Sequence, residues 1–97
     1  APPPFALFLA SIGTCAGIYI LNFCKQRGLP TDGLEIKQRM RMDAATRMIN
    51  TLTLDIHLPK GFPEKYKDAV VRSADQCAVK KHMVQAPEFE INPIIPS

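Results

Sequence analysis

The longest apolar run of the chain extends from residue 5 to residue 23 and contains no charged residue. Lys25 and Arg27 follow it, and Gly28 comes next, a combination of late cations and a glycine cap that is typical of a helix end. We therefore predict one long helix. A helix that is apolar all round must be buried on all sides in a soluble protein. Because a chain of 97 residues can hardly surround it, we expect a dimer in which two such helices pack together.

The alternative to a buried helix is a membrane span, since about 20 apolar residues cross a bilayer. Several polar side chains interrupt the run, namely Ser11, Thr14, Cys15, Tyr19 and Asn22, and no Trp belt flanks it. The prolines at its start do not resemble the basic start of a signal peptide. We favour the buried helix and expect no membrane partner. The small residues Ala10, Gly13, Thr14 and Gly17 predict close approach of another helix backbone.

The next segment alternates apolar and charged residues, which predicts a β-hairpin. Pro30 and Asp32-Gly33 form the turn that leads into it. One strand places Leu34, Ile36, Met40 and Met42 on one face and Glu35, Lys37, Arg39 and Arg41 on the other. After a turn at residues 43–46, the second strand places Met48, Leu52, Leu54, Ile56 and Leu58 on one face. We expect the charged face in solvent and the four methionines, Met40, Met42, Met48 and Met83, in the core.

A second helix and a last strand complete the predicted order of helix, strand, strand, helix, strand. Pro63-Glu64 is a favourable helix start. One helical face then collects Tyr66, Ala69, Val70, Ser73 and Cys77 at spacings of three and four. After Pro87, Phe89 and Ile91 alternate with polar residues as a short strand. The fold class is α+β, with one domain over residues 1–97. Because the chain opens with Ala1 and three prolines directly before its central helix, we expect upstream sequence to be missing.

Composition narrows the function classes. The net charge of +3 is mild and no dense basic run is interleaved with aromatics, so we expect no nucleic-acid partner. Three widely spaced cysteines resemble neither a secreted disulfide framework nor a zinc site. We therefore expect a reducing compartment, the cytoplasm, with no metal and no cofactor. His57 falls on the exposed strand face and His82 at a helix end, so neither is expected to be catalytic.

The three cysteines differ in whether the predicted elements could bring them to a partner thiol. Cys24 lies nine residues after Cys15 on the same helix, roughly 13 Å along the axis, which is too far for a disulfide. We expect Cys24 to be a buried apolar thiol. Cys15 and Cys77 both fall on inward-facing helix surfaces, so the folded chain could bring them together. Two such thiols are either packing or a redox pair, and spacing alone favours packing.

Two motifs bear on that choice. The first is Pro4 with the segment Leu7-Phe8-Leu9-Ala10-Ser11-Ile12-Gly13-Thr14-Cys15, and the second is Ala74-Asp75-Gln76-Cys77-Ala78-Val79-Lys80-Lys81-His82-Met83. Together with Gly28-Leu29-Pro30 before the strand at Leu34-Glu35-Ile36, they resemble the OsmC/Ohr family of organic hydroperoxide reductases over essentially the whole chain. The resemblance implies an intertwined homodimer with a long central helix at its heart. It implies that Cys15 attacks a hydroperoxide, Cys77 resolves the sulfenic acid, and a dithiol reductant opens the disulfide.

The chain departs from the family pattern near Cys15. Active members carry a glutamate nine or ten residues before the first cysteine, where it holds a catalytic arginine; here those positions are Ala6 and Phe5. Members also have about one more hairpin or small sheet before the central helix, and the arginine comes from that upstream region. Cys15 itself lies too far from the N-terminus of its helix for the helix dipole to lower its pKa. A substitute cation could come from Arg39, Arg41, Arg47 or Arg72, and the sequence selects none. Two hypotheses stay open: a peroxide reductase, and a non-catalytic dimeric binding or redox-responsive module.

Overall fold

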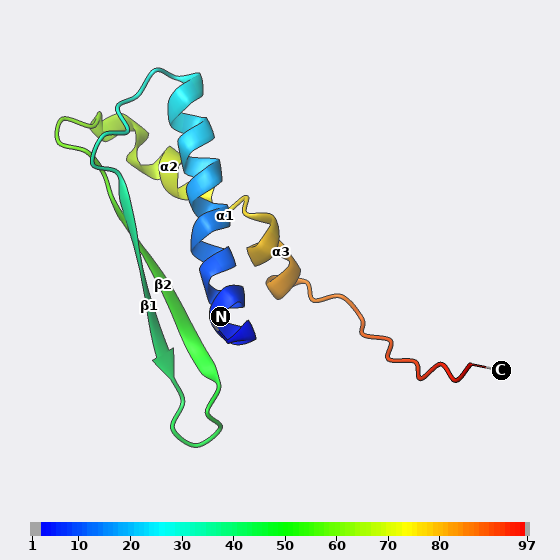
Figure 1. Ribbon diagram of the computed structural model, residues 1–97. Coiled ribbons are helices and arrows are strands. Elements are labelled where there is room, and N and C mark those ends of the chain that lie inside the picture. Colours follow the sequence, from blue (N-terminus) through cyan, green and yellow to red (C-terminus); the bar gives the residue numbers. More distant parts are fainter. Residues whose placement is uncertain (1–2, 97) are drawn as a thin grey trace.

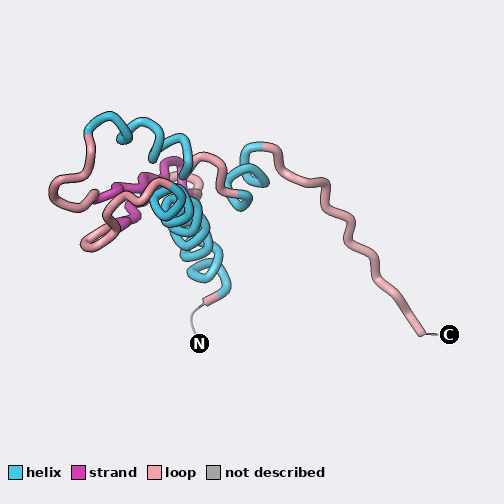
Figure 2. Tube along the Cα trace, turned by 90° about the horizontal axis from the view of Figure 1, so that it is seen from above, coloured by secondary structure: helices cyan, strands magenta, loops and turns pink. Residues whose placement is uncertain are grey.

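The computed structural model describes residues 3–96 and has the predicted α+β architecture (Figure 1). Ala1, Pro2 and Ser97 of the predicted domain lie outside the described residues. The elements are α1 (Pro4–Gln26), β1 (Glu35–Met42), β2 (Ile49–His57), the 3₁₀ turn η1 (Glu64–Tyr66), α2 (Lys67–Ala74) and α3 (Ala78–Val84). Figure 2 shows α1 beside the two strands, with the chain after α3 extending away from both.

The long helix α1 forms as predicted. Pro4 is compatible with its first turn, where a backbone N–H has no helical partner. Lys25 lies in its last turn, and Gly28 has the left-handed conformation (φ 64°) expected of a residue that ends a helix.

The predicted hairpin is confirmed. β1 and β2 pair antiparallel, with Glu35 opposite His57 and Met40 opposite Leu52, and the register shifts between Arg41 and Met42. On its solvent-facing side, Arg39 donates two hydrogen bonds to Asp55, at 2.6 and 3.2 Å.

The hairpin turn reaches beyond the predicted residues 43–46. The backbone N–H of Asp43 donates to the carbonyl of Met48 (2.7 Å), and Arg47 adopts a positive φ of 61°. The Asp43 carboxylate accepts hydrogen bonds from the hydroxyl and the backbone N–H of Thr46, which fix the turn and lower the pKa of Asp43.

The core lies where one stripe of α1 meets the hairpin and α2. The buried α1 residues recur every fourth position, as Ile12, Ala16, Ile20 and Cys24. Ile20 and Cys24 form one cluster with Phe62 and Val70. Partly buried residues surround this cluster: Phe23, Leu29, Leu34, Ile36, Ile56, Leu58, Tyr66 and Ala74.

Of the small residues expected to let another helix backbone approach, Gly13 and Gly17 lie against the sheet, whereas Ala10 and Thr14 are exposed. A Cβ added at Gly13 would lie 3.1 Å from Oε1 of Gln38, and one at Gly17 would lie 3.6 Å from Cδ1 of Ile36. The residue types were indicative of close approach, but the neighbours are side chains of β1.

One side of α1 is uncovered within the described chain. Leu7 and Ile18 are 57% and 54% exposed, and Leu21 is 39% exposed. By length and composition α1 would also suffice to cross a bilayer. The expectation that one chain cannot surround this helix is confirmed, because only a single stripe of α1 is buried.

Two further expectations are wrong for the described chain. The four methionines expected in the core are 41–67% exposed. Met40, Met42 and Met48 are exposed because the hairpin extends past the part of its face that α1 and α2 cover (Figure 1), and Met83 lies on α3. The last strand expected at Phe89 and Ile91 is not formed, since residues 86–96 have no regular structure and no strand lies beside them to complete a ladder.

The buried cluster gives a stability prediction. Val70 is 1% exposed whereas its neighbour Val71 is 54% exposed. We expect Val70→Ala to lower the free energy of unfolding by about 2 kcal/mol, because it removes buried methyl groups and leaves a cavity. Val71→Ala is the matched control and should cost well under about 1 kcal/mol. Urea denaturation followed by circular dichroism measures both, and equal losses would contradict the assigned core.

Candidate functional site: a thiol pair between two helices

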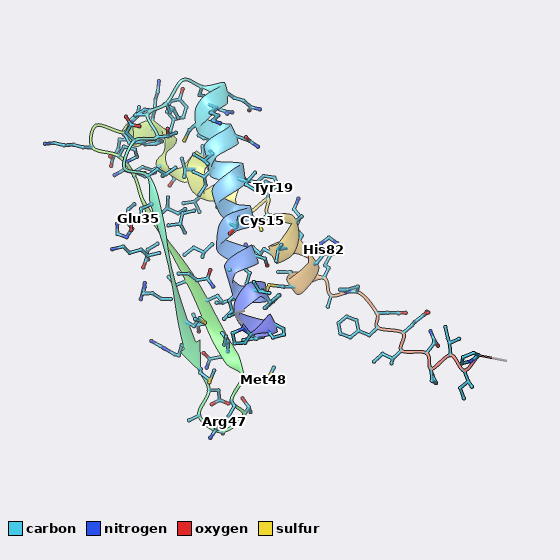
Figure 3. All side chains as sticks on the ribbon, in the orientation of Figure 1. Cys15, Tyr19, Glu35, Arg47, Met48 and His82 are labelled. Carbon is cyan, nitrogen blue, oxygen red and sulfur yellow. The ribbon has the colours of Figure 1, made fainter. Side chains whose placement is uncertain are left out.

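Cys15 lies on the side of α1 that faces the start of α3 (Figure 3). It is half-buried, and it follows the buried Ile12 by three positions. One turn further along α1, the carbonyl of Tyr19 accepts a 2.9 Å hydrogen bond from the Ser73 hydroxyl of α2. This bond and the cluster around Val70 fix the end of α2 against α1. They therefore determine where the next residues, which include Cys77, are placed.

Cys77 occupies a break between two helices, which corrects the predicted continuous helical face. α2 ends at Ala74, a turn follows, and Cys77 is the N-cap of α3. The side chains of Asp75 and Lys80 form an ion pair across this break, and the Cys77 carbonyl accepts the backbone N–H of Lys81 (3.0 Å). Tyr66, Ala69, Val70 and Ser73 keep their predicted inward or half-buried positions. Cys77 is 1% exposed but belongs to the next helix.

The break brings Cys15 and Cys77 together without a disulfide. The Cys77 thiol donates a hydrogen bond that lowers the pKa of Cys15, and the backbone N–H of Val79 lowers it further. Burial opposes these two effects, and the backbone N–H of Ala78 adds a smaller lowering. The pKa of Cys77 is raised, chiefly by burial and next by its hydrogen bond to Cys15. Cys15 is therefore the sulfur favoured as a thiolate, and Cys77 the one favoured as a neutral thiol.

These backbone donors are what the sequence reasoning missed. Cys15 is too deep in α1 to gain from the N-terminus of its own helix, as expected. The donors come instead from the first residues of α3, about sixty positions later in the chain. No glycine or proline marks the break between α2 and α3, so the sequence offers little signal for it beyond Asp75, a residue type common in turns.

None of the four arginines considered as a substitute cation contributes to the shifted pKa of Cys15. Arg39 is engaged by Asp55 on the solvent side of the hairpin, and Arg47 lies in the hairpin turn (Figure 3). Arg41 and Arg72 are exposed on β1 and α2. Within residues 3–96, hydrogen bonds alone shift the Cys15 pKa downward.

Cys24 is fully buried, and burial raises its pKa against a smaller effect of Arg27. This confirms the expected buried apolar thiol. The two histidines are exposed, and Nδ1 of His82 lies 2.7 Å from the carbonyl of Ala78. In the described part of the chain, no group of three His, Cys, Asp or Glu side chains is arranged to hold a metal ion.

A groove of about 520 Å³ runs between α1, β2 and the two short helices, and Cys77 is part of its wall. Its other lining residues are Ile12, Ala16, Leu52, Leu54, Ile56, Val71, Ala74, Met83 and Val84, with Asp75 and Lys80 at a polar margin. The thiol pair is thus next to an apolar recess that suits an organic molecule better than a strongly hydrated one.

Comparison with known proteins gives one family. Residues 1–92 match the family model described as OsmC-like protein. No curated protein matches the chain. No solved structure matches it either.

The thiol geometry predicts an order of reactivity. Rapid alkylation with iodoacetamide over a pH series, read by mass spectrometry, should modify Cys15 at lower pH than Cys24, because only the thiolate reacts. Cys77→Ala should shift the Cys15 profile to higher pH, since it removes the hydrogen bond that contributes most to the lowered pKa. Cys24→Ala is the control and should leave the Cys15 profile in place. A Cys15 profile that is unchanged in Cys77→Ala would contradict the assignment.

Proposed function

The chain belongs to the OsmC-like protein family, and from this premise we propose that it is a thiol-dependent organic hydroperoxide reductase that uses Cys15 and Cys77. The observation that carries the proposal is the contact between the two thiols, with their pKa values shifted in opposite directions. The thiol that attacks the peroxide has to be ionised, while the resolving thiol has to stay neutral until the sulfenic acid has formed. Burial and hydrogen bonding create that difference between the two cysteines.

The chemistry follows in three steps. The Cys15 thiolate attacks one peroxide oxygen: the S–O bond forms, the O–O bond breaks, and the leaving alkoxide takes a proton to become an alcohol. Cys77 sulfur then attacks the Cys15 sulfenic acid, forming the disulfide and releasing water. A dithiol reductant restores both thiols by exchange and is itself oxidised to a disulfide. Because Cys15 and Cys77 are already in contact, the second step needs no large movement.

The apolar groove beside Cys77 supports an organic hydroperoxide as the substrate class. Its lining is mainly aliphatic side chains, so a hydrocarbon group would be favoured there over a hydrated one. The partly exposed Cys15 would meet the peroxide group, and the organic substituent would lie in the groove.

The protein is further proposed to act as a homodimer in a reducing compartment, the cytoplasm, without a nucleic-acid or membrane partner. The exposed apolar side of α1, formed by Leu7, Ile18 and Leu21, supports the dimer. Packing against the same side of a second α1 would remove this surface from water. Three free cysteines in the structure fit a reducing compartment.

One observation favours a second candidate, a non-catalytic dimeric binding or redox-responsive module of the same family. Phe5 and Ala6 stand where active members carry the arginine-holding glutamate, and no cation contributes to the lowered pKa of Cys15. In this case the thiol pair would be retained for packing or for slow oxidation, and the groove would bind a ligand without turnover.

A thiol titration separates the two candidates. One equivalent of cumene hydroperoxide should consume two of the three thiols within seconds to minutes and produce a Cys15–Cys77 disulfide, identified by peptide mapping. In Cys77→Ser, Cys15 should instead accumulate as a sulfenic acid that dimedone traps. Cys15→Ser should lose reactivity with peroxide altogether.

Cys24→Ser is the matched control, and it should oxidise as the wild type does. Retention of all three thiols in the wild type would reject the reductase and leave the non-catalytic module. A disulfide that involves Cys24 would reject the assigned pair.

The dimer has its own test. Ile18 and Val71 are equally exposed, at 54%, and only Ile18 lies on the uncovered side of α1. We expect sedimentation without detergent to give a dimer for the wild type and for Val71→Lys, and a monomer for Ile18→Lys, because the buried ammonium would be unpaired. A monomeric wild type, or one that pellets with added lipid vesicles, would contradict the proposed packing of α1.

A further inference from the structure

Two side-chain contacts span the break between α2 and α3, and we call them the bridges. Lys80 forms an ion pair with Asp75, and Nζ of Lys81 donates a 3.0 Å hydrogen bond to Oε1 of Gln76. Each bridge joins a residue of α3 to the residue five positions earlier, in the turn that follows α2. Within residues 3–96, no other side-chain hydrogen bond or ion pair joins this turn to α3.

The spacing of the bridges makes them specific to the broken chain. Side chains that are neighbours on a continuous helix are three or four positions apart. Residues five positions apart differ by about 140° around the helix axis, so they face different sides. A continuous helix over residues 67–84 would therefore lose both bridges. They stabilise the arrangement of two separate helices (Figure 1) relative to that alternative.

Other features hold the start of α3 only weakly. Residues 67–84 contain neither Gly nor Pro, the two residue types that most disfavour the interior of a helix. No residue of α3 is buried, and Val79 is half-buried. Cys77 is buried but precedes the helix. The bridges are thus the contacts on which the separation of α3 from α2 depends.

This separation decides where two backbone N–H groups are directed. In a continuous helix, Ala78 and Val79 would donate to the carbonyls four positions earlier, those of Ala74 and Asp75. In the structure the N–H groups of Ala78 and Val79 are hydrogen-bonded to Cys15. The contacts that keep the helices apart therefore also keep these donors at the thiol.

We propose that the two bridges are the positioning contacts of the thiol site: they keep α3 separate from α2, so that its first backbone N–H groups reach the Cys15 sulfur. Asp75 and Lys80 act through the backbone of α3, since their side-chain charges are not among the causes of the lowered Cys15 pKa. The inference deepens the proposed function and rests on it for its role in catalysis.

The direction of the pKa change separates positioning from a direct effect of charge. Loss of the Asp75 carboxylate would by itself lower the pKa of Cys15, and loss of the Lys80 ammonium would raise it. If the bridge positions α3, both Asp75→Asn and Lys80→Met raise this pKa. Iodoacetamide alkylation over a pH series, read by mass spectrometry, measures it. At neutral pH we expect the alkylation rate of Cys15 to fall about threefold in each variant, the size of effect that an exposed ion pair can exert.

Restoring the ion pair with exchanged charges tests the same contact in reverse. Asp75→Lys/Lys80→Asp should return the Cys15 rate to that of the wild type. Lys81→Met removes the second bridge and should slow Cys15 as well.

The control is Glu64→Gln/Lys67→Met, which removes another exposed ion pair, 2.8 Å long, at the start of α2. It should leave the Cys15 rate unchanged. In every variant the buried Cys24 should stay protected, which shows that the fold is kept.

Several outcomes would overturn the positioning role. They are opposite pKa shifts in Asp75→Asn and Lys80→Met, an unchanged Cys15 profile in both, and a charge-exchanged variant that stays slow. None of these readouts uses a peroxide. A wild-type chain that keeps all three thiols with cumene hydroperoxide rejects the reductase, whereas the alkylation profiles alone decide on the bridges.

Discussion

The structure depends on the packing of one stripe of α1, formed by Ile12, Ala16, Ile20 and Cys24, against the hairpin and α2. These residues recur every four positions, so they cover only one side of a helix that is apolar on every side. The hairpin and the short helices are held together through this stripe. Since the chain has no further element for the other sides of α1 within the described residues, the same apolar composition that builds the core leaves surface that a second copy can cover.

The thiol pair follows from how α2 docks on this stripe. Val70 in the core and the hydrogen bond from Ser73 to the Tyr19 carbonyl fix the end of α2 on α1. The chain then turns, and α3 starts beside Cys15 with its backbone N–H groups free to donate. In a continuous helix those N–H groups would instead have donated to carbonyls of the same helix. The break between α2 and α3 is therefore what gives Cys15 its donors, and Cys77 is placed at the break itself.

Periodicity predicts the elements well where burial and local pattern agree. The helix over Pro4–Gln26, its glycine end and the antiparallel hairpin all follow from residues close together in sequence. The position of Cys77 and the exposure of Met40 and Met42 do not, because they depend on where a helix breaks and on how far α1 reaches along the sheet. The strand expected near Phe89 fails for a related reason. Its alternation is present in the sequence, but a strand also needs a neighbouring edge, and the chain after α3 extends away from the hairpin (Figure 2).

Cys15 and Cys24 show why a cysteine motif locates a site without determining its reactivity. Both are thiols on the same helix, yet burial raises the pKa of Cys24, while hydrogen bonds from Cys77 and the start of α3 lower that of Cys15. Cys24 has Lys25 and Arg27 close by in sequence and Cys15 has no charged neighbour, yet Cys15 has the lowered pKa, because its donors come from a segment about sixty residues away in sequence. Hydrogen bonds stabilise a thiolate less than a nearby full positive charge would at the same distance. Hydrogen bonds alone therefore suffice to make Cys15 the more readily ionised of the two thiols, and the proposed reductase would have to work with a thiolate that no full positive charge stabilises.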